Sequence, residues 1–389
     1  MTTSADLSAV TSAGPAAGRV LIVNSGSSSL KLSLLGPSDA VLATLDIDRW
    51  DGDPGHGGLA GFTAGLGAVD AVGHRVVHGG SQFTGPTLID DAVLAAIDSL
   101  TGLAPLHQPR AVAGIKAVRA LLPAVPAVAC FDTSFHATLA PAAATYALPQ
   151  NWRERFGLRR YGFHGLSHSY AARRGAQLAG AAASRLRIVT CHLGAGASLA
   201  AVRDGSCVDT TMGFTPLEGL VMATRSGSVD PGMMVWLQQH GLSLEELSSG
   251  LEFSSGLAGL ASLPTSSGDM REVAAAADAG NPAARLAIDV YVHRLRREIA
   301  AMAAAMNGLD VLVFTGGVGE HAPRIRAAAA AGLGFLGVAA DPGRNSALRA
   351  DGDITAPGAA ARTVVVTARE DVEIARQTRG VLAGPHTAT

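Results

Sequence analysis

Cysteine is scarce in this chain, and its scarcity excludes two kinds of site. Three cysteines occur in 389 residues, at Cys130, Cys191 and Cys207. They are too few and too scattered for a disulfide framework or for a metal site of the CxxC type. All three lie in or beside apolar runs, where a free thiol is usually buried. We therefore expect three buried free thiols.

A charge excess of one sign and a long hydrophobic run are also missing. The formal net charge is −2, which gives no reason to expect binding to nucleic acid or to a membrane surface. No uncharged apolar stretch reaches the roughly 18 residues of a membrane span, and residues 1–18 lack the basic start and apolar core of a signal peptide. We expect a cytoplasmic protein without a nucleic-acid or membrane partner, and a flexible tail over residues 1–18.

The two best-known nucleotide-binding motifs are absent as well. No GxxxxGKS or GxxxxGKT loop occurs, which excludes a P-loop NTPase, and no GxGxxG follows a first strand in a βαβ unit. The chain has instead three turns rich in Gly or Ser, each after a predicted strand, at residues 24–29, 192–198 and 315–320. Small side chains let backbone N–H groups approach an anionic oxygen, and Lys31 can supply a point charge to phosphate. Any one of these turns also fits an ordinary hairpin, but the three together favour nucleotide binding.

The length of the chain and the order of these turns predict its architecture. A chain of 389 residues with 48% apolar content favours two globular domains. The first turn joins strands predicted at 20–23 and 30–34, and the second joins strands predicted at 186–191 and 199–203. The third turn leads from a strand at 311–314 into a helix. The repeated unit predicts a duplicated α/β fold of the actin-like ATPase type, whose two similar halves face one cleft.

The remaining elements follow from periodicity and composition. Further strands are predicted at 41–47, 69–78, 125–131 and 363–367. Helices are predicted within 90–122 (interrupted by a loop at 102–109), at 170–180, at 283–306 and after residue 371. The Gly-rich stretch 51–67 is predicted to be a loop.

Seven motifs, in order along the chain, resemble those of the acetokinase family. They are NSGSSSLK (24–31), GHRVVHGG (73–80), APLHQP (104–109), CFDTSFH (130–136), YGFHGLSH (161–168), MGFTPLEGLVMATRSGSVDPG (212–232) and TGGVGEH (315–321). The resemblance implies reversible transfer of the γ-phosphoryl group of ATP to acetate by direct in-line displacement, giving acetyl phosphate and ADP. It implies Mg2+ as the cofactor, with Mn2+ as a substitute, and ATP and acetate as the substrates.

The same resemblance implies how the chain is divided and assembled. Residues 19–136 plus 372–384 would form the N-terminal actin-like domain, and residues 137–371 the C-terminal, nucleotide-binding one. The fold would be the duplicated ribonuclease H-like fold, and the protein a homodimer. Two alternatives stay open: a kinase of this family that prefers propionate or butyrate, and a non-catalytic nucleotide-binding regulator. A pure binder has no need of carboxylate-binding arginines, which argues against the regulator.

Arginine is the residue type that a carboxylate substrate requires, because its planar fork matches the carboxylate and stays charged. Arg75 and Arg225 are the candidates, since each lies among small or apolar residues without an adjacent acid in the sequence. From the residues alone, a structural salt bridge is the alternative. The resemblance implies that both arginines bind substrate and act in catalysis, and that Arg225 and His164 stabilise the transition state.

Two histidines in the fifth motif have several interpretations. His164 lies between Phe163 and Gly165, in a turn from which its ring can donate to a transferring oxygen, although a lone histidine is more often a packing residue. His164 and His168 lack the acidic third partner of a zinc site, so we do not predict a metal there.

Three polar residues are assigned to the phosphates and the metal. By resemblance, Asp132 is catalytic, either near the metal or as the group that orients Arg225. Asn24 and Glu370 are the implied magnesium-linked residues, and magnesium commonly takes only one or two carboxylates from a protein. From the residues alone, Glu370 also fits an ordinary acidic residue at a helix start.

The resemblance assigns the binding residues as well. Those for the acyl substrate are Arg75, Val77, Leu106, Phe163 and Pro216, with His107 as a substrate-side or structural group. Those for the nucleotide are Lys31, His192, Leu193, Gly194, Ala195, Gly196, Asp269, Met270, Arg271, Gly317, Val318 and Gly319. The chain departs from the family at Ala195, where Asn is usual, at Ser228, where Asp is usual, and at His321, where Asn is usual. The lost amide at Ala195 bears on the choice of phosphoryl donor.

Overall fold

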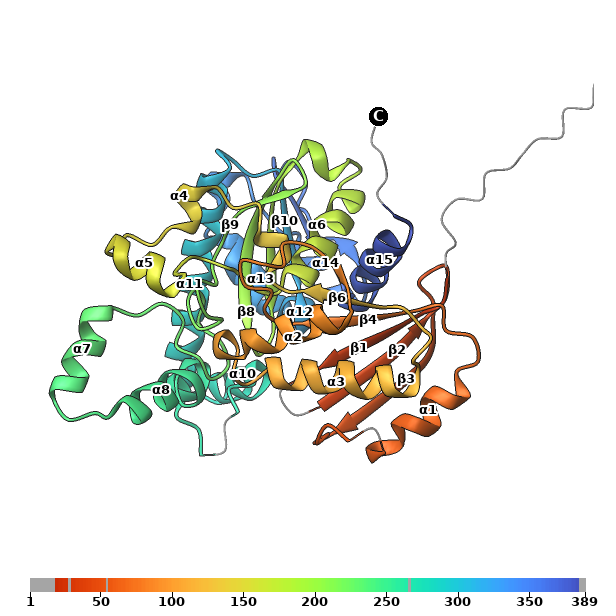
Figure 1. Ribbon diagram of the computed structural model, residues 1–389. Coiled ribbons are helices and arrows are strands. Elements are labelled where there is room, and N and C mark those ends of the chain that lie inside the picture. The colour runs from red at the N-terminus through yellow and green to blue at the C-terminus, as the bar shows by residue number, and fades with distance from the viewer. Residues whose placement is uncertain (1–17, 27–28, 54, 265–266, 385–389) are drawn as a thin grey trace, which may run out of the picture.

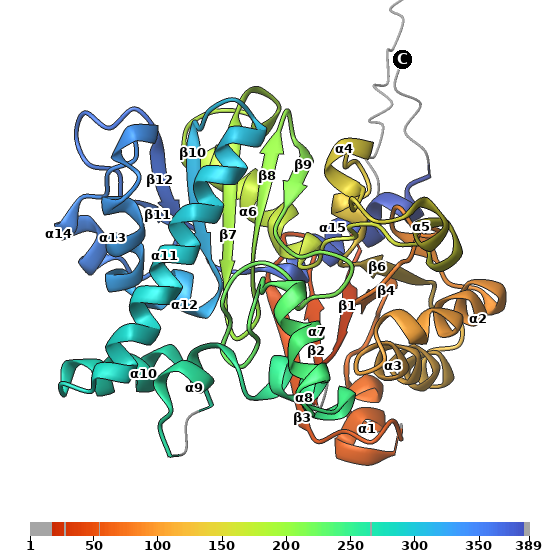
Figure 2. The ribbon, with the colours of Figure 1, turned by 90° about the vertical axis from the view of Figure 1, so that its left-hand side faces the viewer.

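The computed structural model describes residues 18–26, 29–53, 55–264 and 267–384. Residues 1–17 of the predicted tail and residues 27–28 of the first predicted turn lie outside these ranges. The described part is built on two six-stranded sheets with helices packed on their faces (Figure 1). A second view, turned by 90°, shows the two sheets next to each other (Figure 2).

The first sheet has the strand order β3-β2-β1-β4-β6-β5. Its strands are β1 (Val20–Ser25), β2 (Ser29–Leu35), β3 (Val41–Asp48), β4 (Ala71–Val76), β5 (Thr87–Leu88) and β6 (Ala127–Phe131). β1, β2 and β3 form an antiparallel meander, while β4 and β6 run parallel to β1 and β5 closes the edge antiparallel to β6.

The second sheet repeats this plan, in the order β11-β12-β10-β7-β8-β9. Its strands are β7 (Arg187–Leu193), β8 (Ala197–Arg203), β9 (Ser206–Thr210), β10 (Val311–Thr315), β11 (Gly352–Asp353) and β12 (Arg362–Val365). β7, β8 and β9 are antiparallel, β10 and β12 run parallel to β7, and β11 closes the edge. Strand for strand, this is the topology of the first sheet, and the predicted duplicated actin-like fold is confirmed.

Helices cover both faces of each sheet. They are α1 (Leu59–Gly65), α2 (Asp91–Ser99), α3 (Gln108–Leu121), α4 (Pro141–Ala144), α5 (Gln150–Phe156), α6 (Gly165–Leu178), α7 (Pro231–Gln239), α8 (Leu244–Phe253), α9 (Gly256–Ala261), α10 (Met270–Asp278), α11 (Pro282–Ala305), α12 (Gly316–His321), α13 (Pro323–Ala331), α14 (Pro342–Ala347) and α15 (Glu370–Leu382). Among the described helices, none is both long and apolar enough to cross a bilayer.

Alternation along the strands decides which helix lies on which face. In β7, Val189 and Cys191 pack into the core with α11. Ile188 precedes Val189, so it lies on the opposite face of the sheet and packs with α6. In the first sheet, Leu21 and Val23 face α3. The opposite face of that sheet is covered by α15, the last helix of the chain, which crosses back from the second half. α6 and α15 therefore lie together at the junction of the two halves.

Several details of the predicted elements are wrong, and one is that the third turn, predicted at 315–320, is itself helix α12. Within the stretch 51–67, predicted as a loop, the structure forms helix α1, because Leu59 and Thr63 lie one turn apart and are both buried against the first sheet. The helix predicted from residue 170 begins at Gly165, directly after His164 in the left-handed region (φ 56°). The second turn is confined to residues 194–196, since β7 and β8 extend further than predicted. The three cysteines are free and buried, as predicted. The domain boundaries at residues 136 and 371 stay a prediction.

Candidate active site

The ends of three neighbouring strands of the first sheet bring together an arginine, an amide and a carboxylate. Asn24 and Arg75 are register partners on β1 and β4, and Asp132 follows β6. The Arg75 guanidinium donates to both Asp132 oxygens, from Nη2 at 2.6 Å and from Nε at 3.2 Å, and its Nη1 donates to Asn24 Oδ1 at 3.2 Å. Ligands of open α/β sheets bind at these carboxyl ends of parallel strands.

Glu370 reaches this group from the start of α15. Its Oε2 lies 3.9 Å from Arg75 Nη1, and both side chains are 19% exposed. Burial opposes the charge of Arg75, but the carboxylates of Asp132 and Glu370 outweigh it and raise the pKa of Arg75. The arginine is therefore a permanent, fixed cation. The partner that the structure gives to the Asp132 carboxylate is Arg75, and the two roles left open for Asp132 stay predictions.

His164 stands at the start of α6, opposite this group. Its Nδ1 lies 2.9 Å from Ser198 Oγ, and its ring stacks on that of His192 with centroids 4.4 Å apart. Ser198 Oγ is also 2.8 Å from His168 Nε2, and Ser167 Oγ is 2.7 Å from His192 Nδ1. Burial, the neighbouring histidines and then the charges of Arg75 and Arg225 lower the pKa of His164 well below its ordinary value. The ring is neutral at physiological pH.

Arg225 lies beside the second turn and is held far less firmly than Arg75. Its Nη1 donates to the Pro216 carbonyl at 3.5 Å, and its Nε is 4.0 Å from Glu252. A Cβ placed on Gly196 would lie 3.4 Å from His164 Nε2 and 3.6 Å from Arg225 Nη1, so these two side chains flank that turn. Burial and the charges of Arg225 and Arg75 lower the pKa of His107 to about 4.

A cavity of about 700 Å3 opens next to the second turn. Of the residues predicted to bind nucleotide, its lining includes Gly194, Ala195, Asp269, Met270, Arg271, Gly317 and Val318. Its apolar part comes from Leu257, Ile288, Tyr291 and Ile325, which sequence reasoning did not single out. Tyr291 repeats with the buried positions of α11 and gives no other local signal. The departures Ala195 and His321 both line the cavity.

Other predicted residues lie outside that lining. Lys31 points away from the buried face of β2, with a 60% exposed side chain 3.8 Å from Asp46. His192, Leu193 and Gly196 belong to the second turn and its strand, and the Gly319 carbonyl accepts from buried Arg326. Of the acyl-pocket residues, Val77 and Phe163 share one core cluster, whereas Leu106 is 46% exposed.

Two sheets of one topology, with a site of paired arginines and carboxylates where they meet and a cavity of about 700 Å3 beside it, define a phosphotransferase of the actin-like fold. The chain belongs to the acetokinase family, whose model matches residues 61–376. The acetate kinase of Leifsonia xyli subsp. xyli is 47% identical, across 94% of this chain and 99% of that protein. Porphyromonas gingivalis acetate kinase superimposes with a TM-score of 0.87 at 36% identity, covering 94% of this chain and 100% of that one. A propionate kinase from Francisella tularensis gives a TM-score of 0.85 at 34% identity, covering 93% and 99%.

Proposed function

We propose that this protein is an acetate kinase, which reversibly transfers the γ-phosphoryl group of ATP to acetate and gives acetyl phosphate and ADP. The observation that carries the proposal is geometric: Arg225 and His164 flank the second turn, whose Gly194 and Ala195 line the cavity, and the backbone next to His164 is bonded to Asp132, which holds Arg75. Family membership and the curated relatives named acetate kinase support it.

The chemistry requires positioning and neutralisation of charge more than covalent work. A carboxylate oxygen of acetate attacks the γ-phosphorus while the bond from that phosphorus to the bridging oxygen of ADP breaks, and no proton has to move. Arg75, held in place by Asp132, and Arg225, which is free to follow the migrating group, neutralise the two anions. A neutral His164 can donate from Nε2 to a transferring oxygen without adding charge.

The residues near Arg75 also fit a magnesium ion, with Mn2+ as a substitute. Among the described residues, no group of three or more His, Cys, Asp or Glu side chains could hold a metal. Magnesium does not need such a group, because it commonly takes one or two carboxylates plus water and phosphate oxygens. Asn24 and Glu370 supply hard oxygen atoms at this place and would hold the ion. When bound, it neutralises charge on the phosphates.

The acyl pocket is proposed to be formed by Val77, Phe163, Pro216 and Leu106. One methylene is worth about 1–3 kcal/mol in such a pocket, so propionate should be a slower substrate rather than an excluded one. The near-equal likeness to a solved propionate kinase keeps propionate kinase as the second candidate.

The homodimer and the cytoplasmic location stay predictions. In α7, the side chains of Val235 and Trp236 are each 54% exposed, which is apolar surface that a partner subunit would cover.

The test is ADP release from Mg-ATP in the presence of acetate, propionate or butyrate. We expect release to require an acid, with the highest kcat/KM for acetate and a value about 10- to 200-fold lower for propionate. A higher value for propionate or butyrate would establish the second candidate. Nucleotide binding without acid-dependent turnover would instead identify a regulator.

A further inference from the structure

Besides Asp132, the chain buries the carboxylate of Glu373, which lies one turn along α15 from Glu370. Glu373 is fully buried, and its oxygens accept from two residues of α6, from Ser169 Oγ at 3.0 Å and from Arg173 Nη1 at 2.8 Å. Arg376 (2.6 Å) and Gln377 (3.0 Å), on the next turn of α15, donate as well. Burial raises the pKa of Glu373, but Arg376 and Arg173 outweigh burial and leave it below its ordinary value. The side chain is an ionised carboxylate.

The two helices that meet at Glu373 both begin in the candidate active site. α15 starts with Glu370, about 4.5 Å along the helix axis from Glu373. α6 starts at Gly165, directly after His164 and about 6 Å along the axis from Ser169. α15 packs on β1, β4 and β6 of the first sheet, whereas α6 packs on β7 and β10 of the second. The bonds from α6 to Glu373 therefore join helices that belong to different sheets.

We propose that Glu373 is a positioning residue for phosphoryl transfer. Its bonds to Ser169 and Arg173 hold α6 against α15 and, together with the contact of Gly165 with Asp132, fix the distance from Glu370 to His164. This inference rests on the proposed function of those two residues. Glu373 touches neither the nucleotide cavity nor the Arg75 group, so it acts only through the helices.

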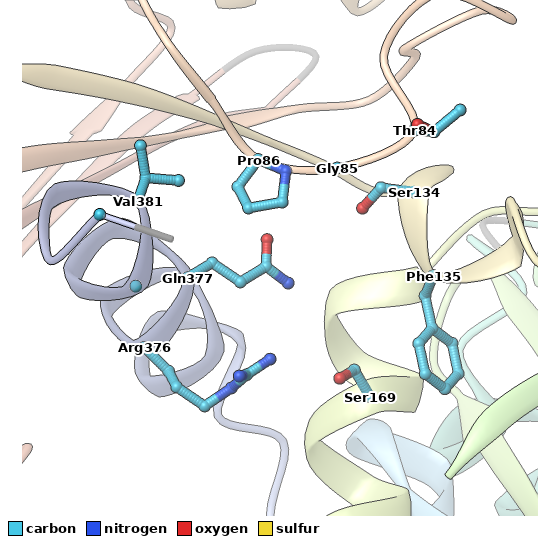
Figure 3. Close-up of a pocket in the computed structure, with 11 residues that line it drawn as sticks. Thr84, Gly85, Pro86, Ser134, Phe135, Ser169, Arg376, Gln377 and Val381 are labelled. Carbon is cyan, nitrogen blue, oxygen red and sulfur yellow. The ribbon is translucent and has the colours of Figure 1, made fainter. Parts of the chain in front are cut away.

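The surroundings of Glu373 provide a matched control. A cavity of about 490 Å3 lies beside it, with Arg376 and Gln377 on one wall and Ser134, Phe135 and Ser169 on the other (Figure 3). Water from this cavity can replace the Arg376 guanidinium, and the bonds from α6 to Glu373 would remain. Arg173 is not part of that lining, and its loss cuts a bond between the helices. Both arginines donate to the same carboxylate, but only one connects the two halves.

The experiment compares Arg376→Met with the double variant Ser169→Ala/Arg173→Met in the full-length protein. We measure kcat and KM with Mg-ATP and acetate, the Kd of Mn2+ and ADP by calorimetry, and the Tm. Because a misplacement of about 1 Å costs up to about 100-fold, we expect the double variant to lose roughly 10- to 100-fold in kcat and to bind Mn2+ with ADP more weakly. Arg376→Met should stay within about threefold of the wild type. Arg173→Lys keeps a charged donor at this position, so its loss in kcat should be much smaller than that of the double variant.

Equal kinetic and binding losses in the double variant and in Arg376→Met would overturn the proposal, because they would follow from loss of stability alone. An unchanged double variant would overturn it too. Should the double variant not fold, the graded pair Arg173→Lys and Arg173→Met decides on the same criteria. A wild type without acid-dependent turnover would refute the proposed function instead, and the binding of Mn2+ with ADP would still test the connection through Glu373.

Discussion

Arg75 and Arg225 carry the same charge but are held to very different degrees. Arg75 is bonded to Asp132 and Asn24, and Asp132 is almost completely buried. Truncating Arg75 would leave that carboxylate unpaired, at a cost of about 3–5 kcal/mol, and would mix lost stability with lost catalysis. Arg225 has one long hydrogen bond and a distant acid. It is therefore the better residue for testing the role of positive charge in the reaction.

Arg225→Ala should lower kcat/KM for acetate by about 100- to 1,000-fold, the usual cost of removing one donor to a transition state. The Tm should change little, because few contacts are lost. The kcat/KM of Arg225→Lys should lie between those of the wild type and Arg225→Ala, since lysine keeps the charge but not the planar fork. Steady-state kinetics and a thermal melt check this, and near-normal turnover of Arg225→Ala would remove Arg225 from the mechanism.

At the scale of elements, the start of α6 is fixed by direct contact with the end of β6. The Gly165 N–H donates to the Asp132 carbonyl at 2.8 Å. A Cβ on Gly165 would lie 2.2 Å from that carbonyl oxygen and 2.9 Å from Phe135 Cβ, so only glycine fits. This close approach places His164 next to the residue that orients Arg75.

Gly165→Ala should push α6 away from Asp132 and reduce kcat at least about tenfold, together with a lower Tm. Gly250→Ala is the control, because Gly250 lies in α8 and a Cβ there meets nothing within 4 Å. The control should keep full activity and gain up to about 1 kcal/mol of stability from the better helix former. Equal activity in the two variants would show that the start of α6 does not need this contact.

The sequence predicts those elements whose signal is local. Apolar runs and alternation predicted nine of the twelve described strands, and the repeated unit predicted the duplication, whereas the short or more polar strands β5, β9 and β11 were missed. Helix α1 was missed because its glycines hide two buried positions one turn apart. The pairing of Arg75 with Asp132 joins residues 57 positions apart, and that of Ser169 with Glu373 joins residues 204 apart. No local pattern encodes such pairs, so motif resemblance proposes site residues but not the bonds that hold them.

At the scale of the whole molecule, the fold encloses several neutral histidines. Burial lowers the pKa of His74 to about 3 and that of His78 and His136 to about 4. In the unfolded chain these groups take up protons near pH 6.5, whereas in the fold they do not until about pH 3–4. Between these values the unfolded state binds more protons, so the free energy of unfolding falls as the pH falls.

Urea unfolding should therefore show a clear loss of stability from pH 7 to pH 5, by up to about 1.4 kcal/mol per pH unit for each such histidine. His74→Leu should reduce that slope, because His74 is buried and its Nε2 has no partner among the described residues. A free energy of unfolding that stays constant between pH 7 and pH 5 would contradict the assignment of neutral buried histidines.

The central claim is that the two halves together pass a phosphoryl group from ATP to a carboxylate. Trapping the product with hydroxylamine tests it most directly, in parallel reactions of the wild type with Mg-ATP and acetate, propionate or butyrate. We predict an acyl hydroxamate that forms in step with ADP and fastest from acetate. ATP turnover without a hydroxamate, or no turnover with any acid, would contradict the account.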